Sequence, residues 1–193
     1  MSTPTSKAWR RLATVGALSL TLAACTGMTV VGGGFPYGSY SRDTVNYLAA
    51  QGPLAVRTVG TVGDMPAPAT ADAIVARFRL PGEFTPATFA VATPEQVAKG
   101  YHLTFVINPD ATPDVLTVCG PEAGAIPTHA AGAEMRIVAA YCYRDEALNR
   151  VIARAPAAAP DSAAFGALLD RIGLALFPYR DPSVNEGKRR RES

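Results

Sequence analysis

Alternating apolar and polar residues mark two segments in the second half of the chain. Residues 101–108 and residues 134–144 place apolar side chains at every second position. This period of two is typical of a β-strand with one face against a core. In the first segment, the residues of the more apolar face are Tyr101, Leu103, Phe105 and Ile107. Both segments are therefore predicted to be strands.

Three further segments fit strands less clearly. Residues 54–60 are rich in β-branched residues and end at a glycine, and residues 114–119, "DVLTVC", form a shorter run. Residues 149–155, "NRVIARA", would pair with the preceding strand through a short turn, which favours a strand. Their alanine and arginine content also suits a helix, so that alternative stays open.

Apolar residues recur at helical spacing in three other segments. Residues 41–50 are predicted to form a helix capped by Ser41, and residues 69–80 a helix with Thr70 as the candidate cap. A third helix begins at Asp161 or Ser162 and ends at Pro178. Its apolar stripe consists of Phe165, Leu168, Leu169, Ile172 and Leu176.

These elements predict an α+β fold. We expect a two-layer sandwich in which two or three helices cover one face of a mainly antiparallel sheet of four to five strands. A chain of 193 residues, 48% of them hydrophobic, is long enough for one such core. No internal repeat is present, so we assign residues 41–182 to a single domain.

The first 25 residues carry the most specific signal in the sequence. Three positive charges precede residues 12–24, "LATVGALSLTLAA", which are uncharged. Thirteen such residues suit a secretory signal peptide and are too few for a transmembrane helix, which needs about 20. The segment ends in Leu22-Ala23-Ala24-Cys25. Residues 1–24 are therefore predicted to be a signal peptide.

The tetrapeptide Leu22-Ala23-Ala24-Cys25 resembles the lipobox of bacterial lipoproteins. The resemblance implies that the Cys25 thiol receives a diacylglyceryl group and that the signal peptide is cleaved just before Cys25. It also implies that the lipid bilayer is a partner of the chain, bound through the acylated Cys25. Thr26 stands where an aspartate often retains such proteins at the inner membrane, so the resemblance favours the periplasmic face of the outer membrane. A plain secretory signal and a twin-arginine signal at Arg10-Arg11 are the alternatives.

The segments that flank the predicted domain are rich in small or polar residues. Residues 25–40 are predicted to be a lipidated, flexible tether, and the glycines at 32–34 fit it better than a phosphate-binding loop, which needs a flanking strand and helix. Residues 183–193 are predicted to be a disordered basic tail that includes Lys188–Arg191. Residues 26–187 carry 11 basic and 15 acidic side chains, a net charge of −4, which argues against a nucleic-acid partner.

Cys119 and Cys142 are the two thiols that remain if Cys25 is lipidated. An oxidising periplasm favours a disulfide between them, provided that their Cα atoms lie about 4.4–6.8 Å apart. A redox-active pair is less favoured because the sequence has no C-x-x-C motif, and a metal site less still because neither histidine stands at ligand spacing from them.

The sequence contains no catalytic signature. Only His102 and His129 are available as the histidine of a serine-type hydrolase, there is no G-x-S-x-G motif, and the acidic pair Asp145-Glu146 falls in a predicted turn. We therefore predict no catalytic, cofactor-binding or metal-binding residue. An envelope hydrolase that uses His102 or His129 is the alternative.

Three segments also resemble small uncharacterised bacterial lipoproteins. These are "ADAIVARFRLPG", "YHLTFVINP" and "FGALLDRIGLALFP", and the resemblance implies no known activity. The sequence thus favours a membrane-anchored periplasmic lipoprotein that binds an envelope protein or cell-wall component, or assists envelope assembly, without catalysis. A structural protein whose basic tail contacts the membrane or the cell wall is a third possibility.

Overall fold

The computed structural model describes residues 27–32, 40–130 and 132–179. The predicted signal peptide, Cys25 and the basic tail lie outside these ranges. The strands are β1 (Thr29–Gly32), β2 (Leu54–Val59), β3 (Phe89–Val91), β4 (Tyr101–Ile107), β5 (Glu134–Tyr143) and β6 (Glu146–Pro156). The helices are α1 (Arg42–Gln51), α2 (Ala67–Arg77), α3 (Pro94–Lys99), α4 (Val115–Cys119), the 3-10 helix η1 (Pro121–Ala125) and α5 (Ala163–Leu176).

The predicted α+β class is confirmed, but the sheet is larger and more mixed than expected. Its six strands follow the order β1-β6-β5-β4-β2-β3. The pairs β1–β6, β6–β5 and β5–β4 are antiparallel, whereas β4–β2 and β2–β3 are parallel. The parallel pairs follow from the connections, because a helix between two strands can return the chain to the same end of the sheet.

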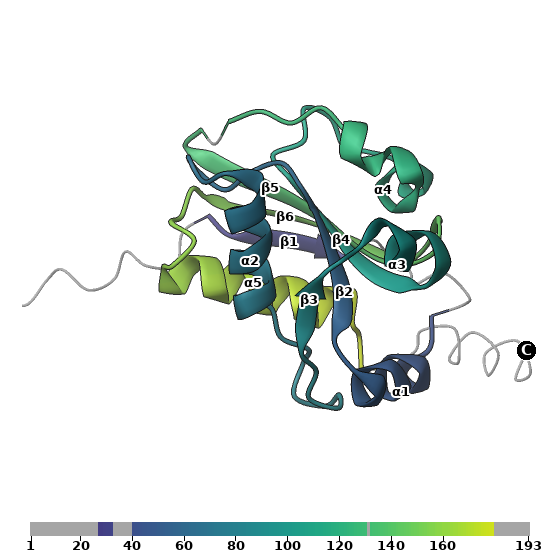
Figure 1. Ribbon diagram of the computed structural model, residues 1–193. Coiled ribbons are helices and arrows are strands. Elements are labelled where there is room, and N and C mark those ends of the chain that lie inside the picture. The colour runs from purple at the N-terminus through teal and green to yellow at the C-terminus, as the bar shows by residue number, and fades with distance from the viewer. Residues whose placement is uncertain (1–26, 33–39, 131, 180–193) are drawn as a thin grey trace, which may run out of the picture.

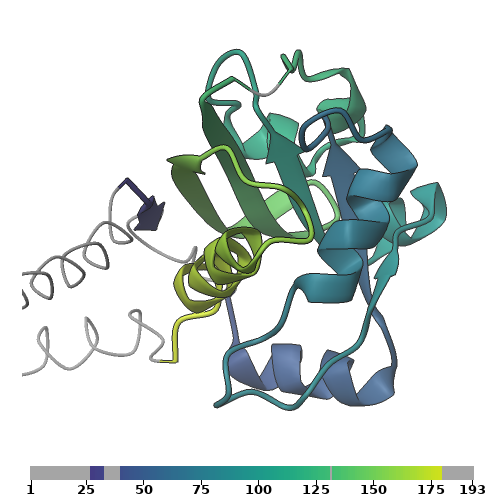
Figure 2. The ribbon, with the colours of Figure 1, turned by 90° about the vertical axis from the view of Figure 1, so that its left-hand side faces the viewer.

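Helices cover both faces of the sheet rather than one, which corrects the two-layer prediction. Helices α2 and α5 pack with the larger apolar cluster, and α4 and η1 pack with a smaller one. Figure 1 shows α4 and α5 on opposite sides of the strands. Figure 2 shows α1 at the bottom of the domain. The strands alternate between two buried faces, so β4 is buried on both.

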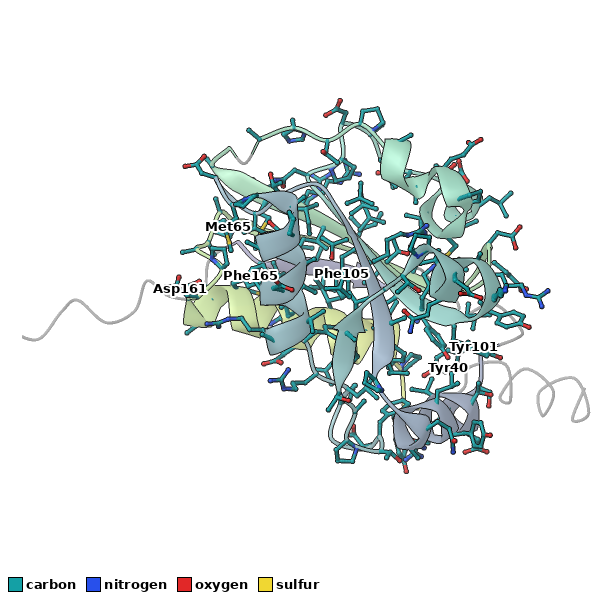
Figure 3. The ribbon with its side chains drawn as sticks, in the orientation of Figure 1. Tyr40, Met65, Tyr101, Phe105, Asp161 and Phe165 are labelled. Carbon is teal, nitrogen blue, oxygen red and sulfur yellow. A yellow bond between two sulfur atoms is a disulfide. The ribbon has the colours of Figure 1, made fainter. Side chains whose placement is uncertain are left out.

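The larger cluster contains the predicted apolar stripe of the last helix. All five of its residues are buried, and Ser162 caps α5 by accepting a hydrogen bond from the backbone N–H of Phe165. Figure 3 shows Phe105 near the middle of the domain. Phe78, which follows α2, has its ring centroid 5.2 Å from that of Phe105 and 5.1 Å from that of Phe89. These edge-to-face contacts join α2 to the sheet.

The prediction of a strand at residues 114–119 is wrong, because this segment forms α4. The Asp114 carboxylate accepts hydrogen bonds from the backbone N–H groups of Leu116 and Thr117, both at 2.9 Å. This N-cap outweighs the strand preference of Val115 and Val118. The strand interpretation of residues 149–155 is confirmed, since they lie within β6 and pair with β5.

The predicted caps of the two earlier helices have different outcomes. Ser41 caps α1, as predicted. Thr70 does not cap α2, which begins after Pro66 without a side-chain cap. Thr70 is instead buried inside the first turn, where its hydroxyl accepts a hydrogen bond from the backbone N–H of Val62 at 3.2 Å. It thereby fixes the β2–α2 loop against the helix.

Part of the predicted tether belongs to the sheet. Residues 29–32 form β1, whose Thr29 pairs with Arg154 of β6, and Val30 packs against the larger cluster. Val30 and Val31 are β-branched residues that suit an edge strand. None of the helices in residues 27–32, 40–130 and 132–179 has the length and hydropathy that a membrane span requires.

Candidate functional site

A groove opens between α3 and the α4–η1 segment, over the smaller apolar cluster. We name it the α3–α4 groove, and it encloses about 560 Å³. Its lining consists of Arg57, Ala92, Pro94, Val97, Ala98, Cys119, Pro121, Gly124, Arg144 and Asp145. Apolar and small residues dominate this lining, and the three charged residues come from β2 and the β5–β6 turn. This composition is typical of a small-molecule pocket.

Arg57 of β2 joins one wall of the groove, the end of α4, to the sheet. Its Nη1 donates to the Gly120 carbonyl oxygen at 2.8 Å, and its Nη2 to the Val118 carbonyl oxygen at 2.7 Å. Its Nε and Nη2 both donate to the Thr104 hydroxyl, at 3.2 and 3.0 Å. Burial lowers the pKa of Arg57 to about 10. The arginine thus holds the C-terminal end of α4, where a cation is favoured.

Arg57 was not among the predicted site residues. One signal was available, because Arg57 stands between Val56 and Thr58 in an otherwise uncharged strand, where a charge must find buried partners. Those partners are carbonyl groups far along the chain, and no local pattern indicates them.

The predicted pair Cys119 and Cys142 lies at bonding distance and forms a disulfide beside the groove. Their Cα atoms are 5.7 Å apart, within the expected range. Cys119 ends α4 and lines the groove, whereas Cys142 lies on β5 with its Sγ 3.9 Å from the Thr104 hydroxyl. The bond therefore attaches α4 to the sheet next to the Arg57 contacts.

His102 lies on the face of the sheet that carries Arg57 and the groove, but its side chain is buried, with 2% of the residue exposed. Its Nδ1 is 3.4 Å from the Gly100 carbonyl oxygen, and its Nε2 has no hydrogen-bond partner within the described part of the chain. Burial, and secondarily the charge of Arg57, lowers the pKa of His102 to about 4. The imidazole is therefore neutral at pH 7 and has no nucleophile within hydrogen-bond reach among the described residues.

This burial predicts an acid-sensitive fold. The pKa of His102 is about 4 in the folded chain against an ordinary 6.5, so the unfolded chain binds the proton more tightly. The free energy of unfolding should fall by about 2 kcal/mol between pH 7 and pH 5 through this residue. Urea unfolding of the purified chain at both pH values, compared with a His102→Asn variant, measures the contribution.

His129→Asn provides the matched control for that experiment, since the His129 side chain is 55% exposed. The control should keep the wild-type loss of stability, and His102→Asn should lose less between the two pH values. Equal losses in wild type and His102→Asn would contradict the assignment of the acid sensitivity to His102.

His129 lies apart from the groove and from His102. Its Nδ1 is 3.0 Å from Oδ1 of Asp110, and both side chains are more than half exposed. Its backbone N–H donates to the carbonyl oxygen of Asn108, which follows β4. Asn108 lies six positions after His102 along extended chain, a span of about 20 Å. The structure therefore does not bring the two histidines together.

The remaining candidate groups form no metal site in the described residues. No group of three or more histidine, cysteine, aspartate or glutamate residues gathers there. Asp145 lies in the β5–β6 turn and lines the groove, and Glu146 begins β6. The acidic pair is thus part of a hairpin, as its turn-like sequence indicates.

Comparison with known proteins yields little similarity. No protein-family profile and no curated protein matches the chain. A structure of a PelC dodecamer, a leucine-to-methionine variant from Paraburkholderia phytofirmans, matches 80% of this chain and 100% of its own, with 10% sequence identity and a TM-score of 0.36. This similarity is too low to inform either fold or function.

Proposed function

We propose that this chain is a lipoprotein anchored through Cys25 to the periplasmic face of the outer membrane. Its domain would bind another component of the envelope, or assist envelope assembly, without catalysis. The observation that carries the proposal is the lipobox-like Leu22-Ala23-Ala24-Cys25 after a charged and then apolar segment.

The disulfide supports an extracytoplasmic location. Cys119 and Cys142 are 1% and 0% exposed, and disulfides persist mainly in oxidising compartments. The α3–α4 groove supports a binding role, since it is concave, largely apolar and carries few charged groups.

The edge of the sheet lies close in sequence to the proposed lipid. A Cβ atom added at Gly27 would lie 3.4 Å from the ring of Pro156 at the end of β6, so Gly27 lies beside this end of the sheet, and β1 begins at Thr29. Thr29 lies four positions after Cys25, and that length of chain spans at most about 14 Å. An acylated Cys25 would therefore hold the domain directly at the bilayer rather than on a long tether.

Membrane attachment is expected to depend entirely on the lipid. Acyl chains contribute about 0.8 kcal/mol per buried methylene, and more than one chain makes attachment stable. The natural chain should sediment with membranes, and its N-terminal peptide should begin at Cys25 with acyl groups attached. A chain with a cleavable secretory signal in place of residues 1–24 and Cys25→Ser should be soluble in the periplasm. Fractionation and mass spectrometry measure both.

Two further chains belong to the membrane-attachment experiment. The secretory signal joined to an unchanged Cys25 is the matched control and should also be soluble, because it lacks the lipobox. Thr26→Asp in the natural chain should move the protein from the outer to the inner membrane. A natural chain that retains Met1, or whose Cys25 is unmodified, would refute the proposal.

An envelope hydrolase is the second candidate function. The observation that favours it is the Asp110–His129 contact, since an acid often orients a catalytic histidine. Within the described residues, however, no serine, threonine or cysteine is a hydrogen-bond partner of the His129 or His102 ring and could act as the nucleophile. The non-catalytic proposal therefore has the stronger support.

A further inference from the structure

The charges of the α3–α4 groove are unusual for this domain. The lining holds Arg57, Arg144 and one acidic residue, Asp145, and its other seven residues are uncharged. Its net charge is therefore +1, although the chain between residues 26 and 187 is acidic overall. A positive, otherwise apolar groove favours an anionic ligand over a neutral or cationic one.

Arg57 lacks an ionic partner among the described residues. Its four hydrogen bonds all go to uncharged oxygen atoms, namely two backbone carbonyls and the Thr104 hydroxyl. The ion pairs of the described chain join Lys99 to Glu95, His129 to Asp110 and Arg154 to Glu134. A guanidinium has five N–H groups, so one hydrogen on Nη1 remains unused.

Arg144 supplies a second cation at the rim. It occupies the β5–β6 turn with a φ of 55°, and its guanidinium lies over the Tyr143 ring, 5.2 Å from the centroid. Its backbone N–H donates to the Gly100 carbonyl oxygen, which ties the turn to the end of α3. The side chain is exposed and forms no ion pair within the described residues.

We propose that the α3–α4 groove binds a small amphiphile that carries one carboxylate, of the medium-chain fatty-acid class. The carboxylate would accept hydrogen bonds from Arg57 and Arg144, and the alkyl chain would lie along Ala92, Val97 and Pro121. A monoanion matches the net charge of the lining, and about 560 Å³ falls within the usual 300–1,000 Å³ of ligand pockets. The inference rests on the proposed function, because it names a ligand class for the binding domain.

The test uses the secreted Cys25→Ser chain, so that no attached lipid competes for the groove. Decanoate is titrated calorimetrically below its micelle concentration, with decanol as the uncharged comparison. We expect decanoate to bind about tenfold or more tightly than decanol, the effect of a hydrogen bond to a charged group. Equal affinities, or no binding of decanoate, would overturn the inference.

Variants separate the carboxylate contact from the apolar contact. Arg144→Gln should weaken decanoate binding about five- to tenfold and leave decanol unchanged. Asp145→Asn should strengthen decanoate binding about two- to fivefold, because the lining charge rises to +2. Val97→Trp should abolish the binding of both ligands by filling the groove. Each variant is checked for native thermal unfolding first.

Arg79→Gln is the matched control, since Arg79 binds the Phe78 and Ala76 carbonyls and does not line the groove. It should leave both affinities unchanged. Decanoate binding that is insensitive to Arg144→Gln and to Val97→Trp would place the ligand elsewhere and overturn the inference. These binding results do not depend on membrane attachment through Cys25. Failure of the ligand proposal would therefore leave the lipoprotein proposal intact, and the reverse also holds.

Discussion

Replacing Phe78 with alanine is expected to lower the free energy of unfolding by about 3–5 kcal/mol. Phe78 is fully buried where α2 ends, and its ring contacts those of Phe89, Phe105 and Phe177. These rings come from β3, β4 and the residue after α5. The substitution would therefore open a cavity at the junction of α2, α5 and the sheet, in addition to the lost transfer energy.

Close backbone packing at this junction limits how far the cavity can collapse. A Cβ atom at Gly173 of α5 would lie 2.8 Å from the Arg79 carbonyl oxygen and 3.7 Å from the Phe78 ring. Helix α5 is thus already as near to the end of α2 as the backbones allow. Less relaxation means a higher cost for a large-to-small substitution, which places Phe78→Ala toward the upper part of the range.

Urea unfolding of the secreted Cys25→Ser chain measures this effect. Leu174→Ala on α5 is the matched control, because Leu174 is 60% exposed and its truncation should change stability by no more than about 0.5 kcal/mol. A domain of this size has a total stability of about 5–15 kcal/mol, so Phe78→Ala would remove a large share of it. A loss below about 1 kcal/mol would show that Phe78 is not central to the core.

Elements were predictable where a long pattern within one segment of the sequence indicates them. The strand β4 was predictable because seven residues alternate, and α5 because one apolar stripe runs along it from Phe165 to Leu176. The three residues of β3 are too few to show a period. The parallel pairing of β2 with β4 depends on tertiary contacts, which a single sequence does not display.

The candidate site shows the same division. Two cysteines in a proposed oxidising compartment predicted the Cys119–Cys142 pair without knowledge of the fold. The groove itself was not predictable, because Arg57, Arg144 and the wall of α3 come together only through the sheet order. Helix α4 was predicted as a strand because its helical signal is a single capping residue, Asp114. The segment also contains several β-branched residues, which favour a strand.

Removal of the disulfide by the double substitution Cys119→Ala and Cys142→Ala is expected to lower the free energy of unfolding by about 3 kcal/mol. The two residues are 23 positions apart, and the chain-entropy model gives this value for a closed loop of that length. Alanine is chosen because both positions are buried, and a serine hydroxyl there would add an unrelated desolvation cost.

Urea unfolding of the double variant in the secreted Cys25→Ser background measures the loss, and thiol labelling of the unfolded, non-reduced parent chain tests its cause. That parent chain has only Cys119 and Cys142, so labelling should find no free thiol. The parent chain unfolded with reductant and refolded should match the double variant. Arg57 still binds the Val118 and Gly120 carbonyls in both, so α4 should stay in place while the domain unfolds at lower urea. Two reactive thiols in the non-reduced parent, or unchanged stability of the double variant, would contradict a stabilising disulfide and remove one of the supports for the periplasmic location.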